Sequence, residues 1–258
     1  MAGGPEGDET LMHTVTTLGT LADNYSYVIE MDGDAVAIDP GEASPVLRVL
    51  DRSASRLRAV LCTHDHFDHT GGNDELARRT GCTVHLPGAA AISNRTELNV
   101  GPFLFTVLRT PGHSSDSVCL YLPPADGQPG DVFTGDTLFV GGCGRLLTRS
   151  PELMWASLQL IAALPPETRV FCGHDYTLEN YEFAVTVEPD NQLVQARLDE
   201  MRKLAETCMP TVPSTIAVER NTNPFLRAAQ PAMKRAVGME NATDVEVFAH
   251  LRRMKDRF

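Results

Sequence analysis

The chain has 258 residues, a formal net charge of −12, 42% hydrophobic residues and 22% charged residues, a composition typical of globular proteins. The acidic balance argues against nucleic acid and anionic membrane surfaces as partners. No apolar run reaches the roughly 18 residues that span a bilayer, so we expect neither a membrane nor nucleic acid as partner.

The first 14 residues are rich in glycine and acidic side chains and contain neither Lys nor Arg. They lack the apolar segment of a secretory signal and the arginines of a transit peptide. We therefore predict a loose N-terminal tail and a cytoplasmic protein.

The chain up to about residue 176 alternates strand-like and helix-like segments, which predicts an α/β domain with sheets covered by helices. The predicted strands are Tyr25–Met31, Ala35–Asp39, Leu57–Cys62, Thr83–Leu86, Phe103–Leu108, Ser117–Leu122, Val132–Thr134 and Thr168–Cys172. The predicted helices are Pro45–Asp51, Asn73–Arg79 and Pro151–Ala163.

Helix signals dominate after residue 176. Leu193–Thr207 carries apolar residues at helical spacing, and a Pro-containing connector, Met209–Pro231, follows it. Thr243 and Glu246 form a capping box that starts the last helix. We predict a metal-binding catalytic domain over 1–175 and a helical substrate-binding domain over 176–258.

The cysteines form no C-x-x-C pair, and several lie in apolar strand-like runs. This placement predicts buried free thiols in a reducing cytosol rather than a disulfide framework. The six cysteines are Cys62, Cys82, Cys119, Cys143, Cys172 and Cys208.

The densest group of metal-ligand side chains is the segment Thr63–His69, with three imidazoles and two carboxylates. In an extended backbone, residues two apart project to the same side, so His64 and His66 can share one metal ion. Asp68 and His69 can then serve a second ion. A solvated polar loop gives no reason for such crowding, so we interpret this segment as part of a metal site.

Three more candidate ligands, His113, Asp136 and His174, each follow an apolar strand and a glycine. The glycine allows the backbone to turn tightly and to approach a ligand closely. We expect these strand ends and the end of the strand that precedes Thr63–His69 to lie together at one edge of an α/β sheet, where such folds place their sites.

Five imidazoles and two carboxylates overfill one site, because a catalytic metal takes about three protein ligands and keeps an open position. They suit two ions about 3.5–4 Å apart that share a hydroxide. One ion would be held by His64, His66 and His113. The other would be held by Asp68, His69 and His174, with Asp136 as the bridge. Nitrogen and oxygen donors do not distinguish zinc, iron and manganese.

The pattern T-H-x-H-x-D-H, with P-G-H, G-D and G-H further along, resembles the metallo-β-lactamase superfamily. Other segments resemble its glyoxalase II family, the hydroxyacylglutathione hydrolases, over nearly the whole chain after the first ten residues. These segments are Leu21–Tyr27, Phe133–Phe139, Gly142–Arg145, Cys172–Thr177, Asn223–Arg227 and Arg252–Asp256.

The resemblance implies an αββα sandwich with a small C-terminal helical domain and a dinuclear centre, with zinc as the first choice and iron or manganese as alternatives. It implies hydrolysis of the thioester S-D-lactoylglutathione to D-lactate and glutathione, the last step of methylglyoxal detoxification, and we expect a monomer. The family's metal ligands fall on the same seven residues. Its glutathione contacts fall on Arg145, Tyr176, Arg252 and Lys255.

The last helix can also be examined without the family. At about 100° per residue, Arg252 and Lys255 fall on its inward arc, whereas Arg253 falls outside. The arc is defined by Val245, Phe248 and Leu251. Two inward cations predict an anionic ligand; cations favoured at a helix end and long stems that reach water are the structural alternatives.

Three further side chains have expected positions. Tyr176 lies two residues after His174, which places its hydroxyl at the mouth of the site, and Arg145 follows a Gly-Cys-Gly turn. Asp39 ends its strand and is expected either to orient the metal loop as a hydrogen-bond acceptor or to form a turn.

The chain departs from the family at one place. Glyoxalase II enzymes usually carry an aromatic residue two positions after the basic residue of the Gly-Cys-Gly motif, where this chain has Leu147. We expect one glutathione contact fewer. Three other functions stay open: a persulfide dioxygenase with one iron, whose family lacks the long helical C-terminal domain; an enzyme of the same fold acting on another thiol ester; and a lactonase or other esterase that would not need Arg252 and Lys255.

Overall fold

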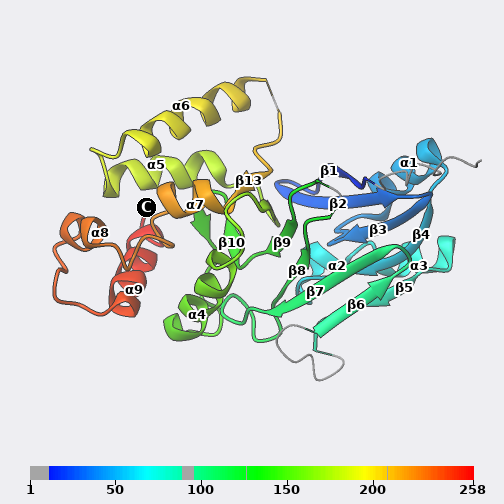
Figure 1. The fold of residues 1–258 in the computed structure, drawn as a ribbon, viewed down its shortest axis with the longest axis horizontal. Coiled ribbons are helices and arrows are strands. Elements are labelled where there is room, and N and C mark those ends of the chain that lie inside the picture. The colour runs from blue at the N-terminus through cyan, green and yellow to red at the C-terminus, as the bar shows by residue number, and fades with distance from the viewer. Residues whose placement is uncertain (1–11, 89–95, 126, 208) are drawn as a thin grey trace, which may run out of the picture.

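The computed structural model describes residues 12–88, 96–125, 127–207 and 209–258. Two β-sheets pack face to face in the middle of the molecule, with helices on their outer sides (Figure 1). The first sheet has the order β1-β2-β3-β4-β5. Its strands are β1 (Thr14–Thr20), β2 (Asn24–Met31), β3 (Asp34–Ile38), β4 (Arg56–Leu61) and β5 (Thr83–His85).

The second sheet has the order β13-β12-β9-β8-β7-β6. Its strands are β6 (Thr96–Val100), β7 (Phe103–Arg109), β8 (Val118–Leu122), β9 (Asp131–Gly135), β12 (Arg169–Cys172) and β13 (Ser214–Thr215). Strands β9 and β12 are parallel, and β8 is antiparallel to both β7 and β9. The C-terminal ends of β7, β9 and β12 therefore lie at the same edge of the sheet. A separate hairpin pairs β10 (Leu138–Phe139) with β11 (Gly142–Cys143).

The main core lies between the two sheets. Tyr27 of the first sheet contacts Phe133 and Phe171 of the second, with ring centroids 5.3 Å apart in both pairs. The rings of Phe133 and Phe171 stack at 5.1 Å on neighbouring strands. All three side chains are fully buried or nearly so, and such buried aromatic pairs add about 0.5–1.5 kcal/mol each beyond their burial.

Helices close the outer faces of both sheets. A second buried cluster joins α1 and α3 to the first sheet, and a third joins α4 and α9 to the second sheet. The helices are α1 (Ala43–Ser53), α2 (Phe67–Thr70), α3 (Asn73–Thr80), α4 (Pro151–Ala162), α5 (Thr177–Val187), α6 (Gln192–Glu206), α7 (Ile216–Thr222), α8 (Pro231–Ala236) and α9 (Asp244–Lys255). The predicted αββα sandwich followed by a helical segment is confirmed.

Every predicted strand and helix is present to within a few residues, but several elements were missed. Strand β1 is an edge strand rich in threonine, so it carries no apolar run. Helix α5 is buried on several sides and shows no single apolar stripe. The connector predicted over Met209–Pro231 is wrong in its middle, where β13 pairs with β12 and α7 follows.

The loose N-terminal tail was predicted over the first 14 residues, of which residues 1–11 lie outside the described part of the chain. For His13 and Thr14 the prediction is wrong. His13 is buried, and its Nε2 lies 2.7 Å from Asp131 Oδ2 on β9. Thr14 already begins β1. The backbone of His13 is held as well, because its N–H donates to Gln128 Oε1 at 3.0 Å.

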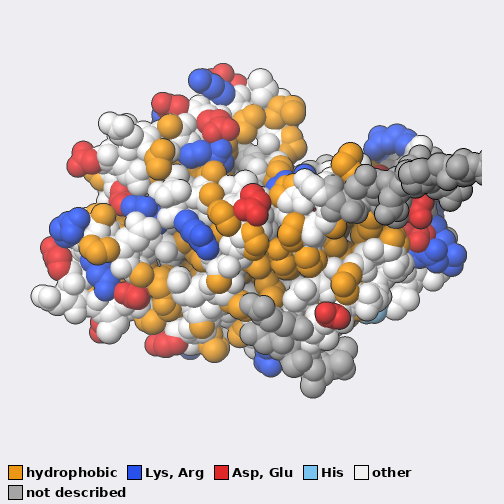
Figure 2. Space-filling view, viewed as in Figure 1, with side chains coloured by type: hydrophobic (Ala, Val, Ile, Leu, Met, Phe, Trp, Pro, Cys, Tyr) orange, Lys and Arg blue, Asp and Glu red, His pale blue; other side chains and the backbone are white. Residues whose placement is uncertain are grey.

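The prediction of free thiols is confirmed for the described cysteines: four are buried, Cys82 is half-buried, and Cys208 lies outside the described residues. Within the described ranges, no helix is both long and apolar enough to cross a membrane. On the face drawn in Figure 2, basic and acidic side chains are interspersed over the helical part, and apolar side chains gather nearer the middle.

Candidate metal centre and substrate pocket

The predicted metal-ligand side chains converge at one edge of the sandwich. The segment with His64, His66, Asp68 and His69 follows β4 of the first sheet. The other three, His113, Asp136 and His174, lie beyond the C-terminal ends of β7, β9 and β12 of the second sheet. The expectation of a single sheet edge is therefore wrong in one respect: both sheets contribute, because the sandwich brings their edges together.

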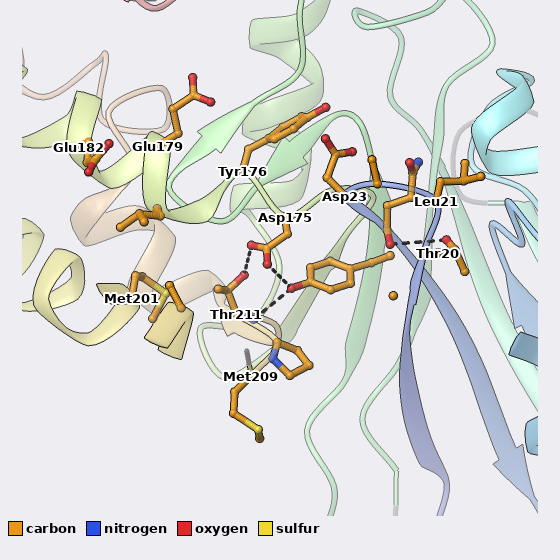
Figure 3. A pocket seen from close by; sticks show the side chains of 17 residues that line it. Thr20, Leu21, Asp23, Asp175, Tyr176, Glu179, Glu182, Met201, Met209 and Thr211 are labelled. Carbon is orange, nitrogen blue, oxygen red and sulfur yellow. Dashed lines mark hydrogen bonds between the residues drawn. The ribbon is translucent and has the colours of Figure 1, made fainter. Parts of the chain in front are cut away.

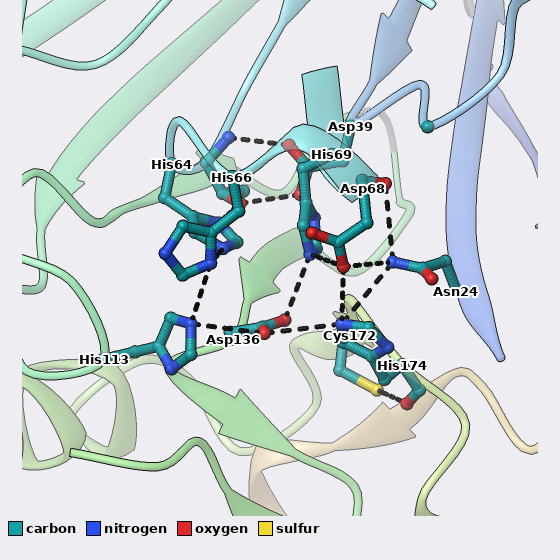
Figure 4. A network of polar contacts seen from close by, with 12 residues as sticks. Asn24, Asp39, His64, His66, Asp68, His69, His113, Asp136, Cys172 and His174 are labelled. Atoms are coloured by element: carbon teal, nitrogen blue, oxygen red, sulfur yellow. Dashed lines mark hydrogen bonds and ion pairs between the residues drawn. The ribbon is translucent and has the colours of Figure 1, made fainter. Parts of the chain in front are cut away.

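Three imidazoles form the first group. His64 Nε2 lies 3.0 Å from His66 Nδ1, and His113 Nε2 lies 3.3 Å from the same His66 atom. Their ligand atoms lie within 4.8 Å of one another, close enough to hold a metal ion. Figure 4 shows the three rings turned toward one another on one side of Asp136.

Asp68, His69 and His174 form a second group that meets the same distance criterion. The Asp68 Oδ2 atom lies 3.4 Å from Nε2 of both His69 and His174. Asp136 lies between the two groups: its Oδ1 is 3.5 Å from His69 Nε2, and its Oδ2 is 3.4 Å from His174 Nε2 and 3.5 Å from His113 Nε2.

These spacings fit metal ions. Four ligands around a tetrahedral zinc at about 2.1 Å are about 3.4 Å apart, which matches the distances within both groups. Two buried atoms at the centre, His69 Nε2 and Asp136 Oδ1, have no hydrogen-bond partner. Buried polar atoms without a partner are costly, so their presence here indicates that an ion completes the site.

The pKa shifts of two histidines, His69 and His64, also support a metal site. Burial lowers the pKa of His69, but the charges of Asp39, Asp68 and Asp136 outweigh it and hold that pKa well above its ordinary range. Burial lowers the pKa of His64 to about 4, which keeps that imidazole neutral and able to donate a lone pair. The carboxylates thus favour positive charge at the centre, which protons or divalent ions can supply.

Two glycines leave room for the side chains of the metal-ligand cluster. A Cβ at Gly173 would lie 2.5 Å from Asp136 Oδ1 and 2.7 Å from His69 Cε1. At Gly135, where φ is +47°, a Cβ would lie 2.1 Å from Thr63 Oγ1. The predicted role of glycine before the candidate ligands agrees with this geometry at both positions.

Asp39 holds the histidine-rich loop in place. Its carboxylate accepts hydrogen bonds from Thr63 N at 2.7 Å and Thr63 Oγ1 at 2.6 Å. Its Oδ2 also lies 3.1 Å from His69 Nδ1, which orients that ring. Both expected roles of Asp39 are present: its side chain orients the metal loop, and its backbone turns, with φ of +47° and the Gly41 N–H donating to Asp39 O at 2.9 Å.

Two positioning residues were missed. Asp23 Oδ1 lies 2.9 Å from His174 Nδ1, and Asn24 Nδ2 donates to Asp68 Oδ2 at 2.9 Å. Both residues belong to the segment Leu21–Tyr27, whose family resemblance was noted without a role. A single sequence does not show that the turn after β1 reaches across to the end of β12.

A cavity of about 540 Å³ opens beside the metal-ligand cluster. The four predicted substrate residues all line it: Arg145, Tyr176, Arg252 and Lys255. The Tyr176 ring stacks on His174 at 4.9 Å with an interplanar angle of 4°, and burial raises the pKa of its hydroxyl to about 12. Leu147, at the position where the family usually has an aromatic residue, also lines the cavity and is exposed.

The two inward cations of α9 have partners within the protein. Arg252 is buried; its Nη1 donates to Cys143 O at 2.8 Å, and its Nη2 lies 3.1 Å from Asp256 Oδ1. Lys255 Nζ donates to the carboxylate of Glu179 on α5. Arg253 is exposed as predicted, but Val245 is only half-buried, and Val247 takes a fully buried place instead.

The loop between β10 and β11 is fixed by the helical segment. Asn223 Nδ2 donates to Phe139 O at 3.2 Å and to Gly142 O at 2.9 Å, and the Gly141 N–H donates to Glu219 Oε2 at 2.9 Å. Glu219 is fully buried, and burial raises the pKa of its carboxyl. These contacts give Asn223, the first residue of the family-like segment Asn223–Arg227, a structural role: it holds the β10–β11 hairpin. Arg145 follows the end of that hairpin.

The fold and the site define a member of the metallo-β-lactamase superfamily, and residues 19–93 and 85–174 match that superfamily. Residues 175–258 match the family described as hydroxyacylglutathione hydrolase C-terminus. The hydroxyacylglutathione hydrolase of Chromohalobacter salexigens is 43% identical over 258 residues, which cover 96% of this chain and 100% of that relative. The chain belongs to the hydroxyacylglutathione hydrolase family, so the predicted family is confirmed.

Solved structures share the architecture. ETHE1 from Myxococcus xanthus has a TM-score of 0.64 and 27% identity, over 93% of this chain and 90% of that one. The structure of TTHA1623 in a di-iron-bound form has a TM-score of 0.59 and 28% identity, over 83% of this chain and 100% of that one. The second shows that a relative of this fold holds two irons.

Proposed function

We propose that this chain hydrolyses the thioester S-D-lactoylglutathione to D-lactate and glutathione. The observation that carries the proposal is the junction of two features: two groups of three metal-ligand side chains joined by Asp136, and a cavity beside them lined by three cations. The family membership and the name of the 43% identical relative support the same reaction.

We assign one divalent ion to His64, His66 and His113 and the other to Asp68, His69 and His174, with Asp136 shared by both. When bound, the two ions lower the pKa of water and polarise a carbonyl oxygen. The all nitrogen and oxygen donor set accepts zinc, iron and manganese alike. We propose zinc as the native metal, as the family resemblance implies, with iron or manganese as alternatives.

The residues of the chain supply binding and orientation. Arg145, Arg252 and Lys255 provide positive charge for the carboxylates of glutathione, and Tyr176, which lines the same cavity, stacks on His174. Hydrolysis adds water across the C–S bond, and the thiol leaves as a thiolate. Since the pKa of a thiol is about 8.5, the leaving group needs no proton from the protein. An amide nitrogen would need one, which favours thioesters as substrates.

We also propose the division of labour expected from the sequence: residues 1–175 bind the metals, and residues 176–258 supply the substrate contacts. The placement of Arg252 and Lys255 on α9, beside a centre held by loops of the two sheets, supports this division.

A panel of thioesters tests the proposal. S-D-lactoylglutathione, lactoyl-coenzyme A and a neutral lactoyl thioester are compared with the same purified sample. We expect the highest kcat/KM for the glutathione ester. Equal kcat/KM for all three thioesters, or no hydrolysis of the glutathione ester, would overturn the assignment.

Arg252→Ala is expected to raise KM for lactoylglutathione about ten- to hundred-fold with kcat nearly unchanged, because a charge-assisted hydrogen bond contributes about 1.5–3 kcal/mol. The matched control is Arg253→Ala, which removes the same charge from the exposed side of the same helix. Steady-state kinetics of both variants check this. A lost kcat at unchanged KM in Arg252→Ala would contradict a substrate contact.

A further inference from the structure

An acidic side chain occupies the substrate pocket. Glu179 on α5 lines the same cavity as the three cations, and its carboxylate accepts a hydrogen bond from Lys255 Nζ on α9. The two residues come from different helices, 76 positions apart in the chain. The pair therefore links α5 and α9 directly at the wall of the cavity.

Lys255 and Glu179 differ in how far their side chains are exposed and in how many contacts hold them. The Lys255 side chain is only 7% exposed, and the Glu179 side chain is 61% exposed. The Lys255 ammonium also lies 3.4 Å from Glu179 O and 5.0 Å from the Phe258 ring centroid, so it stays in place without the carboxylate. The Glu179 carboxylate can swing into water at little cost, because it is mostly solvated already.

The other two cations of the pocket have different partners. Arg252 also pairs with an acid of the same cavity, Asp256, whose side chain is 47% exposed, but it is held in addition by Cys143 O at 2.8 Å. Arg145 is exposed and makes no ion pair with any residue that the structure describes. A substrate carboxylate therefore meets Arg145, which has no such ion pair, and two cations, Arg252 and Lys255, that each already have an exposed acidic partner.

We propose that Glu179 is a specificity-determining residue that competes with a substrate carboxylate for Lys255 and so weakens the preference for anionic thiols. This inference rests on the proposed function. An anionic thiol ester must exchange one carboxylate for another at Lys255 and gains little from the exchange. A neutral thiol ester leaves the Lys255–Glu179 pair intact and loses nothing.

The neighbouring cavity gives the displaced side chain a place to go. Glu179 also lines a second pocket of about 620 Å³, together with Glu182, Met201 and Met209 (Figure 3), and Tyr176 lines both pockets. Glu182 lies one helical turn further along α5, is exposed, and lines only this second pocket. It offers a control with the same charge on the same helix.

The test compares Glu179→Gln with Glu182→Gln. We expect Glu179→Gln to lower KM for lactoylglutathione about two- to five-fold, with kcat within about two-fold, because an ion pair with one exposed partner is worth about that factor. Binding of S-methylglutathione, a thioether that is not hydrolysed, should tighten by the same factor in calorimetry. KM for a neutral lactoyl thioester of N-acetylcysteamine should not change, and Glu182→Gln should resemble the wild type.

A double-mutant cycle separates competition from a structural role. In a Lys255→Met background, Glu179→Gln should have no further effect on S-methylglutathione binding. The inference is overturned if Glu179→Gln leaves KM unchanged or raises it, if the neutral ester improves equally, or if the effect survives in the Lys255→Met background. A wild type that hydrolyses the neutral ester but neither binds nor hydrolyses glutathione derivatives would overturn the proposed function itself. That result is distinct from an active wild type whose KM is insensitive to Glu179.

Discussion

Asp136→Asn is expected to lower kcat/KM at least about 1000-fold and to reduce the bound metal. The carboxylate lies within 3.5 Å of three imidazoles from both ligand groups, and it is buried. Burial raises its pKa, but the contact with His174 and the neighbouring imidazoles outweigh burial and hold the pKa well below its usual range. The loss follows from removing the shared negative charge, since metal assistance contributes several kcal/mol and each 1.36 kcal/mol is about ten-fold in rate.

The control for this prediction is Asp65→Asn, which removes a carboxylate from the same histidine-rich segment. Asp65 is exposed and belongs to neither group of metal-ligand side chains. Its variant should keep its metal and its activity. Metal analysis and kinetics are measured on the same samples. Full metal content and near-normal rate in Asp136→Asn would refute the assignment of the shared carboxylate.

Gly173→Ala is expected to reduce activity about 100-fold without replacing any proposed ligand. The added methyl group would overlap Asp136 Oδ1 and His69 Cε1, so both side chains must move. A displacement of about 1 Å in a catalytic group can cost about 100-fold in rate. Kinetics together with metal content of the purified variant measure the effect.

Gly19→Ala is the matched control, because a Cβ at this position meets nothing within 4 Å. Neither glycine has a positive φ, so alanine imposes no backbone strain at either position. The two variants therefore differ only in what the methyl group contacts. If Gly173→Ala were as active as Gly19→Ala, the centre would be looser than the structure indicates.

Much of the site could be predicted because its residues lie in short sequence patterns that can be recognised without the fold. Thr63–His69 concentrates ligand-type side chains, and His113, Asp136 and His174 each follow a strand and a glycine. The division made from chemistry coincides with two of the three ligand groups that the described residues form; the third joins Asp39 to His64 and His69. The helical spacing of α9 likewise predicted that Arg252 and Lys255 face the pocket.

What could not be predicted depends on contacts between distant segments. Asp23 and Asn24 look like turn residues in the sequence, yet they contact His174 and Asp68. The partners of Arg252 and Lys255, Cys143 O and Glu179, are 109 and 76 positions away. Periodicity shows which face of α9 points inward, but it does not show which other helix supplies an acid there.

The missed elements have a similar cause. Strand β13 has two residues and exists only because it pairs with β12, and β1 is recognisable only beside β2. Helix α5 is buried on several sides between the β10–β11 hairpin and α6, so its sequence lacks a single apolar stripe. Tertiary packing decided these elements, whereas local pattern decided the strands of the core.

A metal titration with activity read in the same sample tests the central claim most directly. The protein is stripped with a chelator and zinc is returned stepwise, while bound ions per chain and hydrolysis of S-D-lactoylglutathione are both measured. The account predicts no activity in the stripped protein and recovery that saturates at two ions per chain. Full hydrolysis in protein that holds no ion, or saturation of both binding and activity at one ion per chain, would contradict it.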